Sequence, residues 1–562
     1  MALSGLAQAA SIATPWSGEP APWLQVLAMG VLVIQLCRAP TPRQAAALGW
    51  VFATAWLCGT FWWLYISMHT YGGLHPVITV LAIVALAALL SVYYAAACYC
   101  FRLFVQVSIP LSALLFAAVW TMAEMARGTW FTGFGWGAVA YAHLWGLGGF
   151  AKYVGAYGVG ALAAYVTCSV ALWLLALQPR PRPLPGTAWI GPAWQSVREA
   201  RSWRSVAPVL LIMGLAAVAD REFSAPGPSL NVALLQGNIR QSEKFEPSTG
   251  IADALRWYRD QAHQAATAAP ANPATAATAA APNGQPSLPW LVVAPETAIP
   301  LLPQQLPPDY WPHLVAPFQA TGGSAPAASV ALLIGIPLGS YSEGYTNSVV
   351  GVPAAGAAEP VAGLAGPGVY SYHKHHLVPF GEFIPPWFKW FTELMNIPLG
   401  DFNRGAVGQA SFAFAGQRLA PNICYEDLFG EELAARFANP ATAPTIFVNL
   451  SNIGWFGNTL AIDQHRAISR MRAMEFERPF IRATNTGDTV VIDHTGHVVR
   501  ALPRHTRGVL TATVQGRQGD AQTGPGITPF AAWAARFGLW PVWIICLIIL
   551  FFSFKKYKNR SI

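Results

Sequence analysis

Residues 291–300 read LVVAPETAIP, in which an apolar segment that continues an expected strand is followed closely by the acid Glu296. Short segments rich in β-branched residues and bounded by Pro, Gly or Asn are typical of buried strands. The segments APNICYEDLFG (420–430) and YHKHHLVPFGEFIP (372–385) also place ionisable residues just after an expected strand. Because α/β folds carry their functional side chains at strand ends, the three segments together indicate a fold class and a site.

Seven strands of this kind are predicted between residues 221 and 533. They are expected at 230–236, 289–294, 330–336, 346–352, 418–424, 444–450 and 488–493. Helices expected at 250–268, 430–438 and 461–477 separate some of the strands, which indicates an α/β layered domain. Residues 264–288 form an Ala/Pro/Thr-rich tract without an apolar period, which we interpret as a surface insertion or linker.

The composition of the whole chain indicates a membrane protein. Of its 562 residues, 54% are hydrophobic and 11% are charged, against roughly 45–50% and about 25% in soluble globular proteins. The net charge is +8, but the basic residues are scattered through short loops, whereas a nucleic-acid binder gathers them on one face. Seven cysteines in this length are too sparse for a disulfide scaffold. We therefore expect a membrane partner and no nucleic-acid partner.

Apolar runs of the length that spans a bilayer, about 20 residues, divide the chain into three parts. They are expected near 22–38, 45–68, 76–101, 108–126, 154–177 and 534–553, with a shorter run at 205–219 and a marginal one at 2–14. These eight runs predict a bundle of about seven transmembrane helices in residues 1–220, a separate domain in residues 221–533, and a C-terminal helix with a basic cytoplasmic tail in residues 534–562.

The positions of Lys and Arg beside these runs predict the orientation of the chain. Four basic clusters fall on one side of the membrane if the helices alternate. They are Arg38 with Arg43, Arg102, the five arginines of 180–204, and the tail from Lys555 to Arg560. Taking this side as the cytoplasm puts residues 221–533 outside. Two charges at the end of the run 108–126, Glu124 and Arg127, are candidates for intramembrane positions. They are expected at a helix end or facing the bundle, as a structural pair rather than as catalytic groups.

Glu296, Lys374 and Cys424 form a chemically coherent set. Cys424 is the only cysteine outside the apolar runs. A free thiol with a pKa near 8.5 is only about 3% thiolate at pH 7, so a nucleophilic cysteine needs a base and a positive environment. Glu296 can accept the proton, and Lys374 can stabilise an oxyanion together with the backbone N–H after the cysteine, a donor typically worth about 2.7–4 kcal/mol. Taken singly, the three also fit a buried small side chain, an acid at a helix N-terminus and a solvated charge.

A metal site is a weaker interpretation. Its candidates are His373, His375 and His376, but their i, i+2, i+3 spacing comes without a thiolate or acid pattern. We therefore predict no metal and no diffusible cofactor.

These residues and their flanks resemble the nitrilase superfamily of carbon–nitrogen hydrolases, and most closely its apolipoprotein N-acyltransferase branch. The motifs that carry the resemblance are LLQGNIRQSEKFEP (234–247), PETAIP (295–300), KHHLVPFGEFIP (374–385), ICYED (423–427), SNIGWFG (451–457) and RMRAMEFERPFIRATNTG (470–487), with WLYISMHTYGG (63–73) and AEMARGTWFTGFGW (123–136) in the membrane part. The resemblance covers nearly the whole chain. It implies a polytopic α-helical membrane domain and a nitrilase-like αββα sandwich domain.

The resemblance also implies roles for the matching residues. Glu296 corresponds to the general base, Lys374 to the oxyanion and charge stabiliser, and Cys424 to the acylated nucleophile. The supporting residues that match are Glu382, as the family's second essential glutamate, and Tyr425 with Glu426 beside the nucleophile. Two positions depart from the pattern. Phe245 stands where relatives commonly have Trp, which keeps an aromatic wall without the indole N–H, and Ile453 replaces an acid, so no carboxylate role is assigned there.

Residues between Glu382 and Asp401 add an argument for a lipid substrate. Four aromatic side chains lie there within five residues, beside Lys389. They are Trp387, Phe388, Trp390 and Phe391. Aromatic and basic residues together favour the membrane interface, so we predict an arm that dips toward the bilayer and gates acyl-chain entry. The alternative is that these aromatics pack as ordinary core.

The expected reaction is a two-step acyl transfer at the outer face of the bacterial inner membrane. Cys424 takes an acyl chain from a glycerophospholipid as a thioester, and the chain then passes to the α-amino group of the lipidated N-terminal cysteine of an apolipoprotein. One alternative is a membrane-tethered nitrilase-like amidohydrolase, in which water resolves the thioester. Another is a transporter or sensor with an extracytoplasmic ligand-binding domain, which predicts that Cys424→Ala retains activity.

Overall fold

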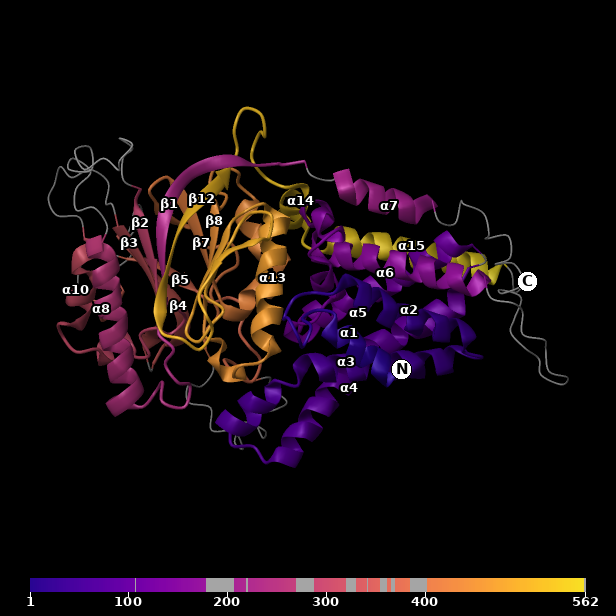
Figure 1. Cartoon of the computed structure of the whole chain (residues 1–562), viewed down its shortest axis with the longest axis horizontal. Helices are drawn as coiled ribbons and strands as arrows, with labels where there is room; N and C mark the ends of the chain where they lie inside the picture. Colours follow the sequence, from indigo (N-terminus) through magenta and orange to yellow (C-terminus); the bar gives the residue numbers. More distant parts are fainter. Residues whose placement is uncertain are drawn as a thin grey trace. The chain divides into compact units, whose positions relative to one another are not determined.

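The chain forms two compact units. The structure is a computed structural model that describes residues 1–106, 108–177, 207–218, 221–268, 288–319, 330–340, 342–353, 361–364, 369–384 and 402–559. The first unit consists of Met1–Tyr65, His75–Arg221 and Phe537–Ile562, and the second of Ile66–Leu74 and Glu222–Arg536. Helices build the first unit, and two sheets with flanking helices build the second (Figure 1).

Each sheet of the second unit has six strands. The first sheet has the order β12 (Gly508–Gln518), β1 (Ala225–Gln236), β2 (Trp290–Val293), β3 (Val330–Ser340), β4 (Gly344–Val352), β5 (Tyr370–His373). The second has the order β11 (Val498–Ala501), β10 (Val490–Ile492), β9 (Phe480–Thr484), β8 (Ile446–Ser451), β7 (Gln417–Ile423), β6 (Phe412–Phe414). The neighbours β1, β2 and β3 are parallel, as are β7, β8 and β9, and the other pairs are antiparallel.

Alternating side chains of the strands build three apolar layers, because successive residues of a strand point to opposite faces. In β1, Val232 and Leu234 pack between the two sheets, whereas Ala233 and Leu235 pack under α8. The helices α8 (Ala252–Ala268) and α10 (Tyr310–Val315) cover the outer face of the first sheet, and α13 (Leu460–Phe476) covers that of the second (Figure 1). The predicted αββα sandwich is therefore confirmed.

All seven predicted strands are present with shifted ends, as β1, β2, β3, β4, β7, β8 and β10. The three predicted helices are present as α8, α12 (Gly430–Ala434) with a 3-10 turn after it, and α13. Most of the tract at 264–288 lies outside the described residues. The prediction missed β5, β6, β9, β11 and β12. Three of these have only three or four residues, β9 contains a buried arginine, and β12 alternates apolar with polar residues along an edge.

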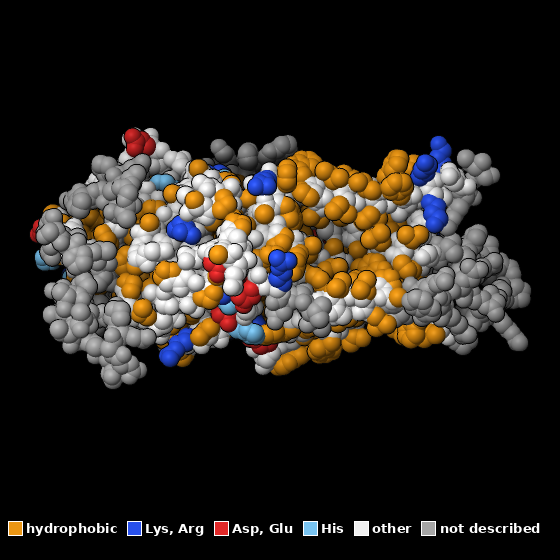
Figure 2. All heavy atoms as spheres, turned by 90° about the horizontal axis from the view of Figure 1, so that it is seen from above, with side chains coloured by type: hydrophobic (Ala, Val, Ile, Leu, Met, Phe, Trp, Pro, Cys, Tyr) orange, Lys and Arg blue, Asp and Glu red, His pale blue; other side chains and the backbone are white. Residues whose placement is uncertain are grey.

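The described helices of the first unit are α1 (Ala2–Ala10), α2 (Pro22–Arg38), α3 (Pro42–Phe61), α4 (Pro76–Phe104), α5 (Ile109–Thr129), α6 (Ala151–Leu177), α7 (Ala207–Val218) and α15 (Trp540–Lys558). A further helix, α14 (Pro529–Phe537), precedes α15. Hydrophobic side chains cover most of this unit's visible surface (Figure 2). Exposed Leu81 and Leu89 of α4, and Ile548 and Phe551 of α15, contribute to such a surface, which suits contact with lipid.

Each of the eight predicted apolar runs contains a helix among the described residues, as α1, α2, α3, α4, α5, α6, α7 and α15. Within the described residues four helical segments are long and apolar enough to cross a membrane: Pro76–Phe104, Ile109–Thr132, Leu147–Leu177 and Trp540–Lys558. Two further apolar helices, Pro22–Arg38 and Ala207–Ala216, are shorter. The run expected at 45–68 ends as a helix at Phe61, and the run at 2–14 ends at Ala10. These two helices end before their apolar runs do, whereas α4 and α6 extend beyond theirs.

The two charges of α5 face the interior of the helical unit, as expected, and both are almost fully buried. Their hydrogen bonds go to different partners. Glu124 Oε1 accepts from the backbone N–H of Val139 at 2.9 Å. Arg127 donates to the Tyr94 hydroxyl at 2.8 Å and to two backbone carbonyls of the segment that follows α5. These bonds fold that segment back onto the helix, which is a structural role.

A short segment between α3 and α4, Ile66–Leu74, packs with the α/β unit. Tyr71 makes an edge-on contact with Trp455, with ring centroids 5.8 Å apart. Trp455 belongs to the 3-10 turn Ile453–Phe456 that follows β8. The α/β unit is therefore completed by residues from the N-terminal part of the chain.

Candidate active site

Three strand ends of the α/β unit bring Glu296, Lys374 and Cys424 together. Glu296 lies three residues after β2, and Lys374 and Cys424 directly follow β5 and β7. The ammonium nitrogen of Lys374 is 3.4 Å from Glu296 Oε1, and both charges act on the Cys424 thiol. Segments about 50 to 130 residues apart in the sequence thus meet in one buried site, as the sequence predicts.

A fourth residue of the site is Glu382, and it shares its partners with Glu296. Lys374 Nζ lies 2.8 Å from Glu382 Oε1. The side-chain amide of Asn347, on β4, donates to Glu296 Oε1 and to Glu382 Oε1 at 2.7 Å each. The backbone N–H of Val378 donates to the other Glu382 oxygen at 2.8 Å. The two carboxylates are therefore held side by side by one ammonium and one amide.

The turn that carries Glu296 is shaped by a close approach to β3. A Cβ at Gly335 would lie 2.4 Å from the carbonyl oxygen of Pro295 and 2.8 Å from the Cα of Glu296, so only glycine fits there. Thr297, the next residue, has a φ of 51°. The backbone N–H of Asn452 donates to Glu296 Oε2 at 2.8 Å. Both carboxylate oxygens are thus occupied, which fixes the orientation of the carboxylate in the site.

Cys424 begins a 3-10 turn, Cys424–Leu428, with a φ of 51°. A non-glycine residue in the left-handed region is uncommon and is held there by its surroundings. The Cys424 carbonyl accepts from Asn449 Nδ2 at 3.1 Å and lies 3.2 Å from His465 Nε2. The Ser451 side chain acts to lower the pKa of the Cys424 thiol. The sharp turn at the strand end directs the thiol toward the carboxylates and the lysine.

Glu426 fixes the backbone on both sides of the nucleophile. Its Oε2 accepts from the backbone N–H of Ile423 and from the Tyr372 hydroxyl, at 2.6 and 2.7 Å. Its Oε1 accepts from the backbone N–H of His375 at 2.6 Å. Glu426 thus joins the turn that carries Cys424 to the segment that carries Lys374. Tyr425, its neighbour, is buried and packs edge-on against Phe429.

The charges of the site shift the pKa values of its members in a consistent pattern. Burial alone raises the pKa of Glu296, but the Lys374 charge, the Asn347 amide, the Lys244 charge and the Asn452 N–H together bring it below its usual value. Burial lowers the pKa of Lys374, and the negative charges of Glu382 and Glu296 outweigh this and raise it. Burial and the Glu296 charge raise the pKa of the Cys424 thiol to about 12. The resting site therefore contains an ionised base, an ionised lysine and a neutral thiol.

A buried ion-pair network lies behind the nucleophile. Asp427 lies 2.9 Å from His465 Nε2, accepts from Ser469 Oγ at 2.5 Å and pairs with Arg482 at 3.4 Å. Burial raises the pKa of Asp427, but the His465 and Arg482 contacts bring it below its usual value. This network anchors the turn of Cys424 to α13 and β9.

The sequence interpretation missed four residues that contact the site: Lys244, Asn347, Asn452 and His465. Lys244 and Asn452 stand within the quoted motifs QSEKFEP and SNIGWFG, which was the available signal. Asn347 lies inside a predicted strand, and His465 inside a predicted helix, where polar residues are ordinarily solvent-facing. Their burial depends on pairing between distant segments, which no local pattern reveals.

The remaining predicted residues are placed as follows. The aromatic arm with Trp387, Phe388, Trp390 and Phe391 lies outside the described residues. Phe245 is half-buried beside Lys244, and Ile453 is buried in the turn after Asn452.

The three histidines considered as metal ligands bond to different groups. The Nδ1 atom of His373 lies 2.9 Å from the Ser348 hydroxyl, that of His375 lies 2.7 Å from the Gly405 carbonyl, and that of His376 lies 2.9 Å from Glu432. Within the part of the chain that the structure describes, no group of three His, Cys, Asp or Glu side chains is arranged to hold a metal ion.

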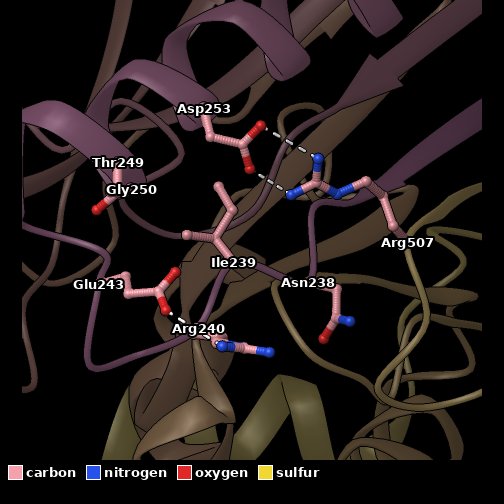
Figure 3. A pocket seen from close by; sticks show the side chains of 8 residues that line it. All are labelled: Asn238, Ile239, Arg240, Glu243, Thr249, Gly250, Asp253 and Arg507. Carbon is pink, nitrogen blue, oxygen red and sulfur yellow. Dashed lines mark hydrogen bonds and ion pairs between the residues drawn. The ribbon is translucent and has the colours of Figure 1, made fainter.

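A pocket of about 280 Å³ lies on the segment that follows β1 (Figure 3). It is lined by Asn238, Ile239, Arg240, Glu243, Thr249, Gly250, Asp253 and Arg507. Its charged groups are paired, Arg507 with Asp253 and Arg240 with Glu243. None of the four residues of the carboxylate–lysine–thiol site lines it, so this pocket is separate from the chemistry.

Two family comparisons cover the two units. Residues 4–169 match the apolipoprotein N-acyltransferase N-terminal domain, and residues 232–521 match the carbon–nitrogen hydrolase family.

Three proteins named apolipoprotein N-acyltransferase are similar to this chain. The protein of Verminephrobacter eiseniae (strain EF01-2) is 52% identical over 542 residues, which cover 96% of this chain and 92% of that protein. Those of Ralstonia nicotianae (strain ATCC BAA-1114 / GMI1000) and Bordetella bronchiseptica (strain ATCC BAA-588 / NCTC 13252 / RB50) are 39% and 36% identical, and the alignments cover 90% and 96% of this chain and 85% and 93% of those proteins. The chain therefore belongs to the apolipoprotein N-acyltransferase family, a membrane-enzyme family of the carbon–nitrogen hydrolase superfamily.

Proposed function

We propose that this protein transfers an acyl chain from a glycerophospholipid, through a thioester on Cys424, to the α-amino group of the lipidated N-terminal cysteine of apolipoproteins. The observation that carries the proposal is the cluster of Glu296, Lys374 and Glu382 at the strand end that bears Cys424. Family membership supports the reaction class and favours acyl transfer over the amidohydrolase alternative.

In the first step the Cys424 sulfur attacks the ester carbonyl carbon of the phospholipid while Glu296 accepts the thiol proton. The raised pKa of the thiol, about 12, favours removal of the proton during the attack over a preformed thiolate. Lys374 and the backbone N–H of Tyr425 stabilise the oxyanion. When the tetrahedral intermediate collapses, the ester C–O bond breaks, and Glu296 returns the proton to the leaving lysophospholipid oxygen.

In the second step the neutral α-amino group of the acceptor attacks the thioester carbon. Glu296 accepts a proton from the attacking nitrogen, and the same oxyanion groups act again. The C–S bond then breaks, the sulfur takes up the proton, and the amide product leaves. A single base and a single cation thus serve both steps.

The membrane setting of the reaction is part of the proposal. The chain is a membrane protein with four apolar helical segments of spanning length among the described residues. We place residues 221–533 on the periplasmic side of the bacterial inner membrane, because this puts the four basic clusters in the cytoplasm. The aromatic arm from Trp387 to Phe391 then serves as the gate by which an acyl chain reaches Cys424.

Mass spectrometry of the purified protein mixed with phospholipid tests this function. We expect a phospholipid-derived acyl mass on the peptide that contains Cys424, its removal by hydroxylamine, and its transfer to a diacylglyceryl peptide with a free N-terminus. An acyl mass on another residue contradicts the assignment of the nucleophile. Hydrolysis of small amides in preference to lipids supports the amidohydrolase, and activity retained by Cys424→Ala supports a transporter or sensor.

A further inference from the structure

Lys244 is a second lysine buried in the active site. Its side chain is 2% exposed, and its Nζ donates to the backbone carbonyl of Glu296 at 3.2 Å. An ammonium group has three donors, and among the described residues the structure gives this one a single acceptor, which is uncharged. A buried charge without a carboxylate partner is costly. Its retention at this position calls for a use of the charge.

The charges of the site show what that use is. Glu296 and Glu382 contribute two negative charges, and Lys374, which contacts both, contributes one positive charge. The pair of carboxylates is therefore left with one excess negative charge. Lys244 acts on Glu296 and on Cys424 through its charge. With Lys244 included, the two carboxylates of Glu296 and Glu382 are matched by two ammonium groups.

The backbone around Lys244 is held in place independently of the side chain. A Cβ at Gly250 would lie 1.9 Å from the Glu243 carbonyl oxygen and 2.9 Å from the Cα of Lys244, so the turn at 247–251 closes directly over this residue. The backbone N–H of Glu246 donates to the Glu243 carbonyl at 2.8 Å. Figure 3 shows that neighbouring Arg240 and Glu243 line the separate pocket. Lys244 is thus fixed toward the site while its neighbours face away from it.

We propose that Lys244 is a positioning residue of the acyl transfer, whose ammonium charge neutralises the second carboxylate and keeps Glu296 ionised as the base. The inference rests on the proposed role of Cys424 as the acylated nucleophile. When the thiol proton moves to Glu296, the negative charge moves to the substrate oxyanion. The two lysines then balance the negative charges of the oxyanion and of Glu382. Without Lys244, the oxyanion develops in a site with excess negative charge.

The proposal predicts a particular dependence on pH. Burial lowers the pKa of Lys244 to about 8, and the charges of Glu296 and Cys424 limit the shift. Other titratable or charged groups lie around the site on each neighbouring element: Glu296, Lys374, Glu382, Glu426, Asp427, His465 and Arg482. The pKa values of Glu296, Asp427 and His465 are lowered and that of Lys374 is raised, so none of these four groups changes its protonation state between pH 7 and 9: His465 stays neutral and the other three stay charged. Loss of the Lys244 proton should then slow acylation above about pH 8.

Single-turnover acylation of Cys424 by phosphatidylethanolamine vesicles, followed by intact-protein mass from pH 6.5 to 9.5, tests this. We expect wild type to be fast at pH 7 and to slow several-fold toward pH 9.5. Lys244→Met should be acylated at least tenfold more slowly at pH 7, and its acylation rate should not change between pH 6.5 and 9.5. Lys244→Arg keeps the charge at all these pH values, so it should stay within about threefold of wild type at pH 7 without the decline. Arg240→Met, a matched loss of one charge from an exposed side chain of the same segment, should behave as wild type.

The outcomes separate this inference from the proposed function. If wild type forms no thioester on Cys424, the proposed function fails. If wild type forms it and Lys244→Met matches the wild-type rate at pH 7, Lys244 has no such role. If Lys244→Met and Lys244→Arg are slowed equally, or if Lys244→Met keeps the decline above pH 8, the lysine acts through packing alone and the charge argument is overturned.

Discussion

Glu382 holds the ammonium group of Lys374 at 2.8 Å, closer than the 3.4 Å that separates this ammonium from Glu296. The lysine proposed to stabilise the oxyanion is therefore anchored by a residue other than the proposed base. This arrangement leaves Glu296 free to accept and return a proton without releasing the lysine. It also distinguishes the expected effects of substitutions at the two glutamates.

Replacing Glu382 with Gln should slow acylation of Cys424 by about ten- to hundredfold, because a hydrogen bond to a charged group is worth about 1.5–3 kcal/mol and the lysine loses its anchor. Single-turnover acylation with phospholipid measures the effect. Glu343→Gln, the same change on an exposed glutamate of the same unit, is the control. An unchanged rate in Glu382→Gln shows that Lys374 is positioned by other contacts.

Removing the proposed base or the proposed oxyanion cation should abolish most acylation while lipid still binds. Glu296→Gln and Lys374→Met should each lower the rate by about a hundredfold, equivalent to roughly 3 kcal/mol. Binding of a non-hydrolysable ether phospholipid, measured alongside acylation, separates chemistry from binding. Near-normal turnover by either variant rejects its proposed role.

Gly335→Ala should displace the turn that carries Glu296, because the added Cβ would lie 2.4 Å from the Pro295 carbonyl oxygen. Overpacking of this kind typically costs about 1–3 kcal/mol of stability. We expect a lower melting temperature and slower acylation. Gly508, on β12 of the same sheet, provides the control. A Cβ there would lie 3.4 Å from the flexible side chain of Leu502, which is an ordinary contact distance. Wild-type kinetics in Gly335→Ala would show that the turn tolerates the shift.

Asp427→Asn should destabilise the α/β unit by about 3–5 kcal/mol, because it leaves the fully buried Arg482 without its carboxylate. The pKa of Asp427 is lowered in the folded protein, so its contribution to stability is present above the unfolded pKa of about 3.9 and is lost as the pH falls through the folded value. Thermal unfolding in detergent, measured from pH 7 in steps down to pH 3, should show that the variant is less stable than wild type. The difference in their stability should become smaller as the pH falls. Asp309→Asn, the same change at an exposed aspartate, should change neither the stability at pH 7 nor its dependence on pH. A pH-independent difference contradicts the ionic role.

Replacing Trp387 and Trp390 with Ser should slow acylation by bilayer phospholipid without slowing the labelling of Cys424 by a small soluble thiol reagent. The reason is that a membrane-dipping arm guides lipid to the site and takes no part in the chemistry. If the aromatic residues pack as core, the double variant should lose several kcal/mol of stability and both reactions should decline together. Equal loss of both reactions with a lowered melting temperature refutes the gate.

The sequence was sufficient for the residues whose signal is local. Glu296 and Cys424 follow apolar strands, and the strands around them are buried on both faces, so their apolar runs stand out. Cys424 itself was expected as the last strand residue, but the chain turns at this point with a φ of 51°. A backbone in the left-handed region at a cysteine is imposed by tertiary contacts and has no signature in composition.

Residues that depend on distant pairing could not be predicted. Arg482 is an interior residue of β9 and is neutralised by Asp427, which is 55 positions away. A strand with a central arginine looks polar until its partner is known. Lys244 likewise looks like a surface lysine between Glu243 and Phe245, and only the fold shows that it points at Glu296.

The nine residues Ile66–Leu74 belong structurally to the α/β unit although the chain reaches them between two helices of the other unit. A gene fragment that encodes residues 222–536 alone would therefore lack Tyr71, which packs against Trp455. It would also lack Ile66, whose side chain lies beside Gly457 at the end of the same turn. The turn that these two residues cover, Ile453–Phe456, directly follows Asn452, whose backbone N–H donates to Glu296. Residues 222–536 are consequently not a complete unit on their own. If two relatives recombined at residues 222 and 536, the segment Ile66–Leu74 would come from one relative and the site that it supports from the other.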